Sequence, residues 1–278
     1  MYTAEISRSN PTCFLFLVDQ STSMDDPFGG QSGKTKSQGV SDAINRLLQT
    51  LVFRCAKGEV ILDRYYIGVI GYGDQVGPAF GGTLAGQGLV PVSKIGNSPL
   101  RLETRSKWSD DGAGGLVEQT VRFPVWFEPK ARGGTPMCQA LDLARQTICA
   151  FVQQVPACFP PIVVNITDGE ATDGDPRAAA AAVQEVMSRD GRALLFNIHI
   201  SSRNEKPFQF PSGEDLLPDN YAKLLFRMSS PLPPQMLGQA QLMDPRIAIG
   251  ARGFVFNADL VSVVQFLDIG TRVDKSLR

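Results

Sequence analysis

Oxygen-bearing side chains that could bind a hard metal ion recur at three places in this sequence. Asp19, Ser21 and Ser23 alternate in DQSTS, Thr135 follows two glycines in RGGTP, and Asp168 follows the apolar run PIVVNIT. Carboxylate and hydroxyl oxygens are ligands that Mg²⁺, Mn²⁺ and Ca²⁺ accept, and no Cys or His accompanies them. If the fold brings the three places together, they form an all-oxygen site, for which we expect Mg²⁺ first.

The segments around these places predict strands that alternate with helices. Short apolar runs predict buried strands at 13–18, 65–72, 161–167 and 193–200. Helical periodicity or alanine content predicts helices at 36–55, 137–155 and 176–189. For the helix at 137–155, Thr135 is the expected N-cap and Pro136 the expected first helical residue. This alternation predicts an α/β fold: an open, mostly parallel sheet with helices on both faces.

The remaining segments are less regular. Toward the end of the chain, the sequence predicts helices at 220–228 and 235–243, a strand at 253–256 and a closing helix at 257–267. In the middle of the chain it predicts loops with a short hairpin at 89–95. The segment 120–127 is predicted to be an edge strand, because Pro124 is poorly tolerated in a central strand. We therefore expect one antiparallel edge strand in the sheet. The interpretation is a single domain over 1–278, with a loop-rich stretch at about 75–118 and an insert at about 202–234.

In an open parallel sheet, ligands bind where loops leave the carboxyl ends of the strands, and this rule selects the three oxygen-bearing places. Each residue also has a plain structural role open to it. Asp19 and Asp168 could cap the helices that follow them, and the capping role of Thr135 can coexist with ligation.

Together, the three motifs resemble the metal-ion-dependent adhesion site (MIDAS) of von Willebrand factor A (vWA) domains. The resemblance implies a vWA-like sheet in which Ser21 and Ser23 bind the metal directly and Thr135 binds it directly or through water. It implies that Asp19 and Asp168 act through water or by hydrogen bonding. In that family an acidic residue of a partner protein commonly completes the coordination. Gln20 stands where many members have a small residue or Thr.

Other chemistries fit the sequence less well. The stretch GGQSGKT has three residues where a P-loop needs four, with Phe28 at the position required to be Gly, and it does not directly follow a strand. There is no G-x-S-x-G motif, and the single histidine, His199, is expected to be partly buried in a strand. We expect no enzyme. The alternative is a metal-dependent phosphatase or phosphodiesterase that uses the same oxygens.

Composition limits the kinds of partner. A formal charge of -1 gives no broad reason to expect nucleic acid or an anionic membrane, and no run approaches the ~20 apolar residues of a membrane span. Five cysteines without C-x-x-C spacing are expected to be mostly buried free thiols in a cytoplasmic protein. Bacterial cytoplasmic members of the resembled family often work with AAA+ ATPases or kinase and phosphatase pairs in stress, resistance, defence or signalling systems.

Overall fold

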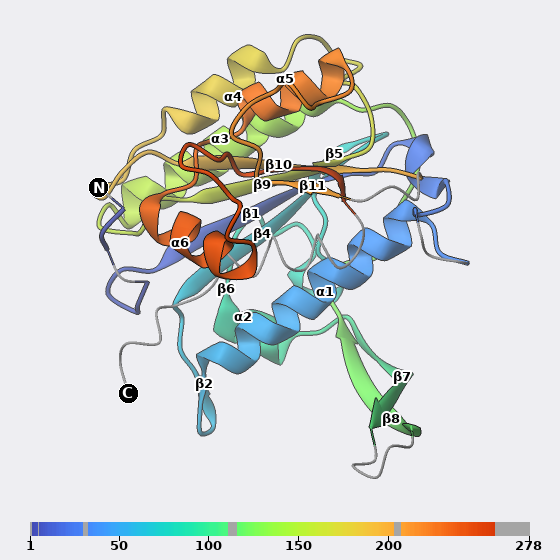
Figure 1. The fold of residues 1–278 in the computed structure, drawn as a ribbon. Coiled ribbons are helices and arrows are strands. Elements are labelled where there is room, and N and C mark those ends of the chain that lie inside the picture. The colour runs from blue at the N-terminus through green and yellow to red at the C-terminus, as the bar shows by residue number, and fades with distance from the viewer. Residues whose placement is uncertain (1, 5, 30–32, 111–115, 203–206, 259–278) are drawn as a thin grey trace.

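The fold is an α/β arrangement with an open, mostly parallel, Rossmann-like sheet, so the predicted fold class is confirmed. The computed structural model describes all residues except 1, 5, 30–32, 111–115, 203–206 and 259–278. Figure 1 shows the sheet crossing the middle of the molecule between two layers of helices.

Within the described residues, the main sheet has eight strands. Their order is β11 (Phe208–Gln209), β12 (Phe254–Ala258), β10 (Leu194–Ile200), β9 (Ile162–Thr167), β1 (Thr12–Asp19), β4 (Tyr65–Tyr72) and β5 (Val76–Pro78), with β6 (Val90–Pro91) also paired to β4. The neighbours from β12 to β4 run parallel, whereas β5, β6 and β11 pair antiparallel. Both edges are therefore antiparallel, where one antiparallel edge strand was expected.

The central strand β1 is buried on both faces, which explains its continuous apolar run. Phe14, Phe16 and Val18 join the core on one face of the sheet, and Leu15 and Leu17 join the core on the other. Side chains alternate between the two faces of a strand, so burial between two helix layers requires apolar residues at every position.

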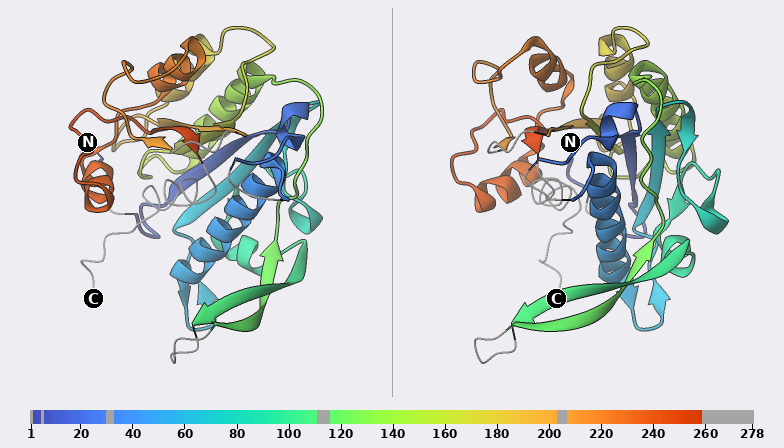
Figure 2. Two further views of the ribbon diagram at one scale, coloured as in Figure 1. Left: turned by 45° about the vertical axis from the view of Figure 1, so that its right-hand side comes forward. Right: turned by 90° about the vertical axis from the view of Figure 1, so that its right-hand side faces the viewer.

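Helices form the outer layers. They are α1 (Lys36–Cys55), α2 (Val92–Asn97), α3 (Met137–Gln154), α4 (Arg177–Gln184), α5 (Asn220–Met228) and α6 (Pro234–Met243). Figure 1 and Figure 2 show α1, α2 and α6 on one side of the sheet and α3, α4 and α5 on the other. The helix α1 begins where predicted, because Thr35 and Gln38 form a capping box at its start.

In the middle of the chain, the predicted hairpin is wrong, and the predicted edge strand is a strand but not one of the main sheet. Residues 89–95 form the short β6 and the start of α2, and 120–127 lies mostly in β8 (Leu116–Val125), outside the main sheet. Among the described strands, β8 pairs only with β7 (Arg101–Asp110), and this β7–β8 arm projects from the body (Figure 2). Such an arm has no continuous apolar face to reveal it, since Leu102 and Val117 are exposed.

Other differences are smaller. The helix α4 ends at Gln184, short of the expected 189, because the chain then turns and the Ala193 N–H donates to the Val186 carbonyl. Short elements are η1 (Thr22–Asp25), η2 (Gly82–Leu84), β2 (Ala56–Lys57) and β3 (Val60–Ile61). The strand predicted at 253–256 is β12, and the closing helix predicted at 257–267 lies mostly outside the described residues. None of the described helices is long and apolar enough to cross a membrane.

Within the insert, the predicted helix at 220–228 is α5, and it packs on the sheet. Leu217, Leu225 and Phe226 are buried against Phe254 of β12. This part of the insert therefore packs on the domain, although Leu216 is exposed.

Candidate metal centre

The strand order places a crevice at the carboxyl end of β1. The chain leaves β1 for β4 on one side and later returns to β9 on the other, and such a reversal opens a ligand site between the strand ends. The strands β1 and β9 end at Asp19 and Thr167, next to each other in the sheet. The loop before α3 reaches the same edge, because Thr22 and Gly133 exchange backbone and side-chain hydrogen bonds.

Asp19 is fully buried, and both of its oxygens accept hydrogen bonds. The Ser21 backbone N–H donates to Oδ1 at 2.8 Å, and the Thr167 hydroxyl donates to Oδ2 at 2.7 Å. Burial raises the pKa of the Asp19 carboxyl to about 6, because desolvation outweighs these hydrogen bonds, and the nearby Asp168 carboxylate also favours the neutral form. A cation nearby would favour the ionised form.

Ser21, Ser23 and Asp168 form a chain of contacts across two loops. The Oγ atoms of Ser21 and Ser23 lie 3.0 Å apart, and the Ser23 hydroxyl donates to Asp168 Oδ1 at 2.8 Å. Adjacent oxygens around a six-coordinate Mg²⁺, each about 2.1 Å from the ion, are about 3 Å apart. The two serine hydroxyls therefore have the separation that neighbouring ligands of one ion need.

Thr135 presents a buried hydroxyl with no hydrogen-bond partner in the described part of the chain. This hydroxyl lies 3.7 Å from the place where a side chain on Gly169 would begin, so it faces the Asp168–Gly169 turn. An orphaned buried hydroxyl is costly unless it meets a ligand or water. Thr135 therefore fits a cation that binds in front of this turn.

The predicted N-cap role of Thr135 is wrong. The N-cap of α3 is Pro136, and the first free N–H groups, of Cys138 and Gln139, donate to the Asp173 carboxylate at 3.1 and 2.9 Å. The backbone of Thr135 is held instead by Thr172. Because Asp173 caps the helix from another loop, the Thr135 hydroxyl is left for a different partner.

The five predicted residues thus lie around one edge of the sheet, in three loops tied together by hydrogen bonds, and their oxygens suit a hard cation. Across the described ranges, no group of three or more His, Cys, Asp or Glu side chains could hold a metal ion. The hydroxyls of Ser21, Ser23 and Thr135 stay the candidate direct ligands, as the resemblance to vWA domains implies. The Asp19 oxygens accept from the Ser21 N–H and the Thr167 hydroxyl, and the Asp168 oxygens accept from the Ser23 hydroxyl and the Lys36 ammonium.

Lys36 was missed by the sequence analysis, although it lies against this centre. Its ammonium is 2.7 Å from Asp168 Oδ2, and 3.3 Å from both the Ser23 carbonyl and Asp26 Oδ2. The side chains of Lys36 and Asp168 are only 7% and 1% exposed, so this is a buried ion pair. Nothing in the helical pattern of α1 distinguishes Lys36 from a solvated residue.

A second set of missed residues connects the insert to the centre. The Tyr221 hydroxyl on α5 lies 3.4 Å from the Thr167 hydroxyl, which in turn donates to Asp19. Burial raises the pKa of Tyr221 far above its ordinary value, so its hydroxyl stays protonated and remains a donor. No sequence signal places Tyr221 near Asp19.

Other polar residues and motifs lie in different surroundings. Asp74 forms an ion pair with Lys130 at 2.7 Å. His199 is partly buried as expected, since its Nδ1 accepts the Asn257 backbone N–H and its ring stacks on Phe256. The P-loop-like stretch falls partly outside the described residues.

Comparison with known proteins gives structural likenesses only. No family model and no curated protein matches the chain. Proximal thread matrix protein 1 from the mussel byssus matches at 14% identity with a TM-score of 0.49, covering 96% of this chain and 47% of that one. The chain thus spans about half the length of that protein.

Two further solved structures match with lower TM-scores. The manganese-loaded TRAP protein of Plasmodium vivax matches at 15% identity and a TM-score of 0.44, over 95% of this chain and 74% of that one. The ArnB paralog VWA2 from Sulfolobus acidocaldarius matches at 11% identity and a TM-score of 0.33, over 72% of this chain and 37% of that one. All these TM-scores are below 0.5, so the fold assignment rests on the strand order and register of the sheet.

Proposed function

We propose that this chain is a metal-dependent protein-binding module, in which a divalent cation at the candidate centre links it to an acidic residue of a partner protein. The observation that carries the proposal is the buried, unpartnered Thr135 hydroxyl facing the Asp168–Gly169 turn, beside the Ser21 and Ser23 hydroxyls. We propose Mg²⁺ as the ion, with Mn²⁺ or Ca²⁺ as alternatives.

In this proposal Ser21, Ser23 and Thr135 hold the ion, and Asp19 and Asp168 hold the loops that carry them. When bound, the ion would offer a coordination position to a carboxylate. Asp19 orients the first loop through the Ser21 N–H, and Asp168 orients the Ser23 hydroxyl. The loop geometry supports binding of a ligand, and we propose no catalytic step.

The class of partner follows only from the resemblance to vWA domains. We propose a protein partner, such as an AAA+ ATPase or a component of a kinase and phosphatase system, in a bacterial stress, resistance, defence or signalling system. We expect neither nucleic acid nor a membrane as the primary partner.

The test combines ion binding with partner capture. Wild type, Ser21→Ala and Thr135→Val are compared for Mn²⁺ binding by calorimetry, and for prey retained in pull-downs with Mg²⁺ or with chelator. Thr147→Val on α3 is the matched control, because in the described residues its hydroxyl bonds the Leu143 carbonyl of its own helix and no residue of the candidate centre. The same prey should be lost in chelator and in both site variants, and kept by the control. Prey that persists in all conditions would exclude the ion bridge.

A further inference from the structure

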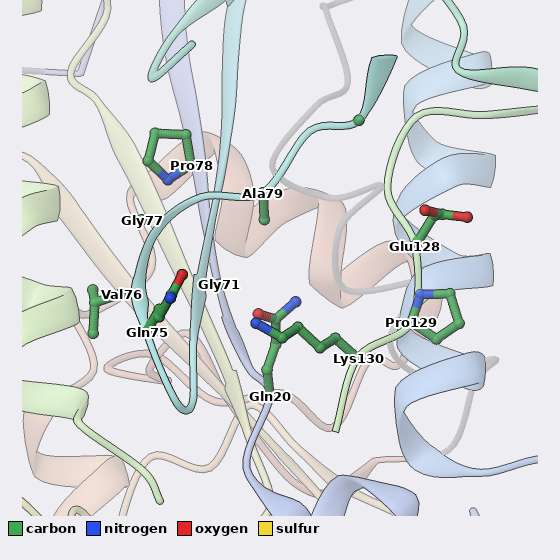
Figure 3. A pocket seen from close by; sticks show the side chains of 11 residues that line it. Gln20, Gly71, Gln75, Val76, Gly77, Pro78, Ala79, Glu128, Pro129 and Lys130 are labelled. Atoms are coloured by element: carbon green, nitrogen blue, oxygen red, sulfur yellow. The ribbon is translucent and has the colours of Figure 1, made fainter. Parts of the chain in front are cut away.

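A cleft opens between two chain segments beside the edge strand β5. Residues 74–81 run antiparallel to 126–133, and the two segments are joined at one end by the Gly81 N–H to the Trp126 carbonyl at 2.9 Å. At the other end the Asp74 N–H donates to the Arg132 carbonyl at 2.8 Å. Between these closures, where every residue is described, no backbone hydrogen bond joins 75–79 to 128–131. The resulting cleft has a volume of about 320 Å³ (Figure 3).

One wall of the cleft is the unpaired edge of β5. The Gln75 carbonyl accepts from Gly73, and the Ala79 N–H donates to Val69 of β4, so alternate residues of this strand turn their backbone groups toward β4. In an antiparallel ladder the residues between them face the opposite way. The N–H and C=O of Val76 therefore face the 128–131 segment without reaching it.

The floor of the cleft is the carboxamide of Gln20. Gln20 is 6% exposed, and within the described residues its side chain has no hydrogen-bond partner. The amide lies over Gly71, where a Cβ would be only 2.2 Å from its oxygen, so only glycine leaves room for it. Figure 3 shows the Gln20 and Lys130 side chains pointing into the space between the two segments. A buried carboxamide without partners is costly, which favours a ligand or water there.

The charges at the rim are already paired. The Lys130 ammonium binds Asp74 at 2.7 Å, and the Glu128 carboxylate binds Arg101. In the described residues, the groups left without partners are therefore the Gln20 amide and the outward N–H and C=O of Val76, each of which offers a donor and an acceptor; Pro78, the other outward residue of β5, has no N–H. An uncharged peptide group complements such pairs, and an extended peptide would also continue the ladder at this edge.

We propose that this cleft is a second binding site, which takes a short, extended, uncharged peptide segment between β5 and residues 128–131. One of its peptide groups pairs with the Gln20 carboxamide and another with the Val76 backbone. The site is distinct from the proposed metal centre, because none of its contacts involves the three candidate hydroxyl ligands, although Gln20 lies between Asp19 and Ser21 in the chain.

The experiment is a titration of the full chain, ¹⁵N-labelled and deuterated, with the capped peptide N-acetylglycylglycinamide, followed by two-dimensional NMR. Saturable shifts are expected for the Gln20 side-chain NH₂ pair and the Val76 amide. The Gln20 pair is assigned from its loss in Gln20→Met. Zwitterionic triglycine serves as the charged comparison, and it should bind more weakly because the cleft offers no unpaired charge.

Two variants and a control test the location. Gln20→Met should weaken binding about fivefold, the effect of one net hydrogen bond. Gly77 pairs with Gly71, so its side-chain position lies on the same face as the Gln20 amide, and a Cβ there meets no atom within 4 Å. Gly77→Leu should therefore fold normally and abolish binding. Gln235→Met, at an exposed position on α6, should leave binding unchanged.

The outcomes separate a site from a water-filled gap. Shifts that stay linear, equal affinity in Gln20→Met, undiminished binding in Gly77→Leu, or tighter binding of triglycine would each overturn the proposal. Ion binding at the metal centre is measured on the same samples and is expected to be unchanged in both variants.

Discussion

Replacing Lys36 with Met is expected to destabilise the ion-free protein and to strengthen its affinity for a divalent ion. Lys36 and Asp168 form a 2.7 Å pair whose side chains are 7% and 1% exposed. Methionine keeps much of the apolar stem and removes the charge. Breaking a buried pair by removing one partner costs about 3–5 kcal/mol, because the remaining charge is left uncompensated.

A divalent ion in the same centre would supply the missing positive charge. We therefore expect the loss in the free energy of unfolding to be about 3 kcal/mol in chelator and about half of that, or less, at saturating Mg²⁺. By linkage, the difference between the two losses is a gain in ion affinity. A difference of about 1.4 kcal/mol corresponds to tenfold tighter binding.

The assay is urea unfolding followed by circular dichroism in chelator and in Mg²⁺, together with Mn²⁺ calorimetry on the same variant. Lys34→Met is the matched control: Lys34 precedes α1, pairs with Asp42 at 2.6 Å, and is 42% exposed. Such a surface pair contributes at most about 1 kcal/mol, and the control should show no dependence on the ion.

Equal losses for Lys36→Met with and without Mg²⁺ would refute the reasoning. That result would mean that the ion does not compensate Asp168. Weaker Mn²⁺ binding in the variant would refute it as well, since it would make Lys36 a support of the ion site and not its competitor.

Three further changes have distinct expected results. Asp19→Asn should remove the loss of stability that the ion-free protein shows as pH rises from about 4 to about 6, because burial raises the pKa of this carboxyl and penalises its ionised form; an unchanged pH profile of urea unfolding would contradict that burial. Asp173→Ala should cost about 1 kcal/mol equally with and without Mg²⁺, since it only removes the cap of α3; an ion-dependent loss would count against that role. Arg105→Ala should speed amide hydrogen exchange in the β7–β8 arm and leave the main sheet protected, because Arg105 binds Asp42 at 2.8 Å and lies 3.7 Å from the Phe123 ring centre. Unchanged exchange in the arm would show that other contacts hold it.

The helices and strands that the sequence predicted correctly are those with the clearest apolar or capping pattern. The strand at 65–72 and the helices at 36–55 and 220–228 have the predicted bounds, because uninterrupted apolar runs or capped amphipathic periods identify them. The β7–β8 arm was missed, because its strands project from the core and lack a continuous buried face.

The candidate centre shows the same division. The residue types and the strand-end positions of Asp19, Ser21, Ser23 and Asp168 can be read along the chain, since each strand ends where its apolar run stops. The hydrogen-bonded chain from Tyr221 through Thr167 to Asp19 cannot be predicted from the sequence, because it joins a helix of the insert to two strand ends.

Local chemistry was therefore enough to indicate the alternating α/β elements and the oxygen atoms available at their ends. Tertiary packing set the surroundings of those atoms: Lys36 reaches Asp168 across 132 residues, and Asp173 caps α3 and leaves the Thr135 hydroxyl without a partner in the described residues. The physical reason is range. Apolar periodicity and helix capping act over a few neighbouring residues, whereas burial, charge compensation and unpaired hydrogen-bonding groups depend on which loops the folded sheet brings together.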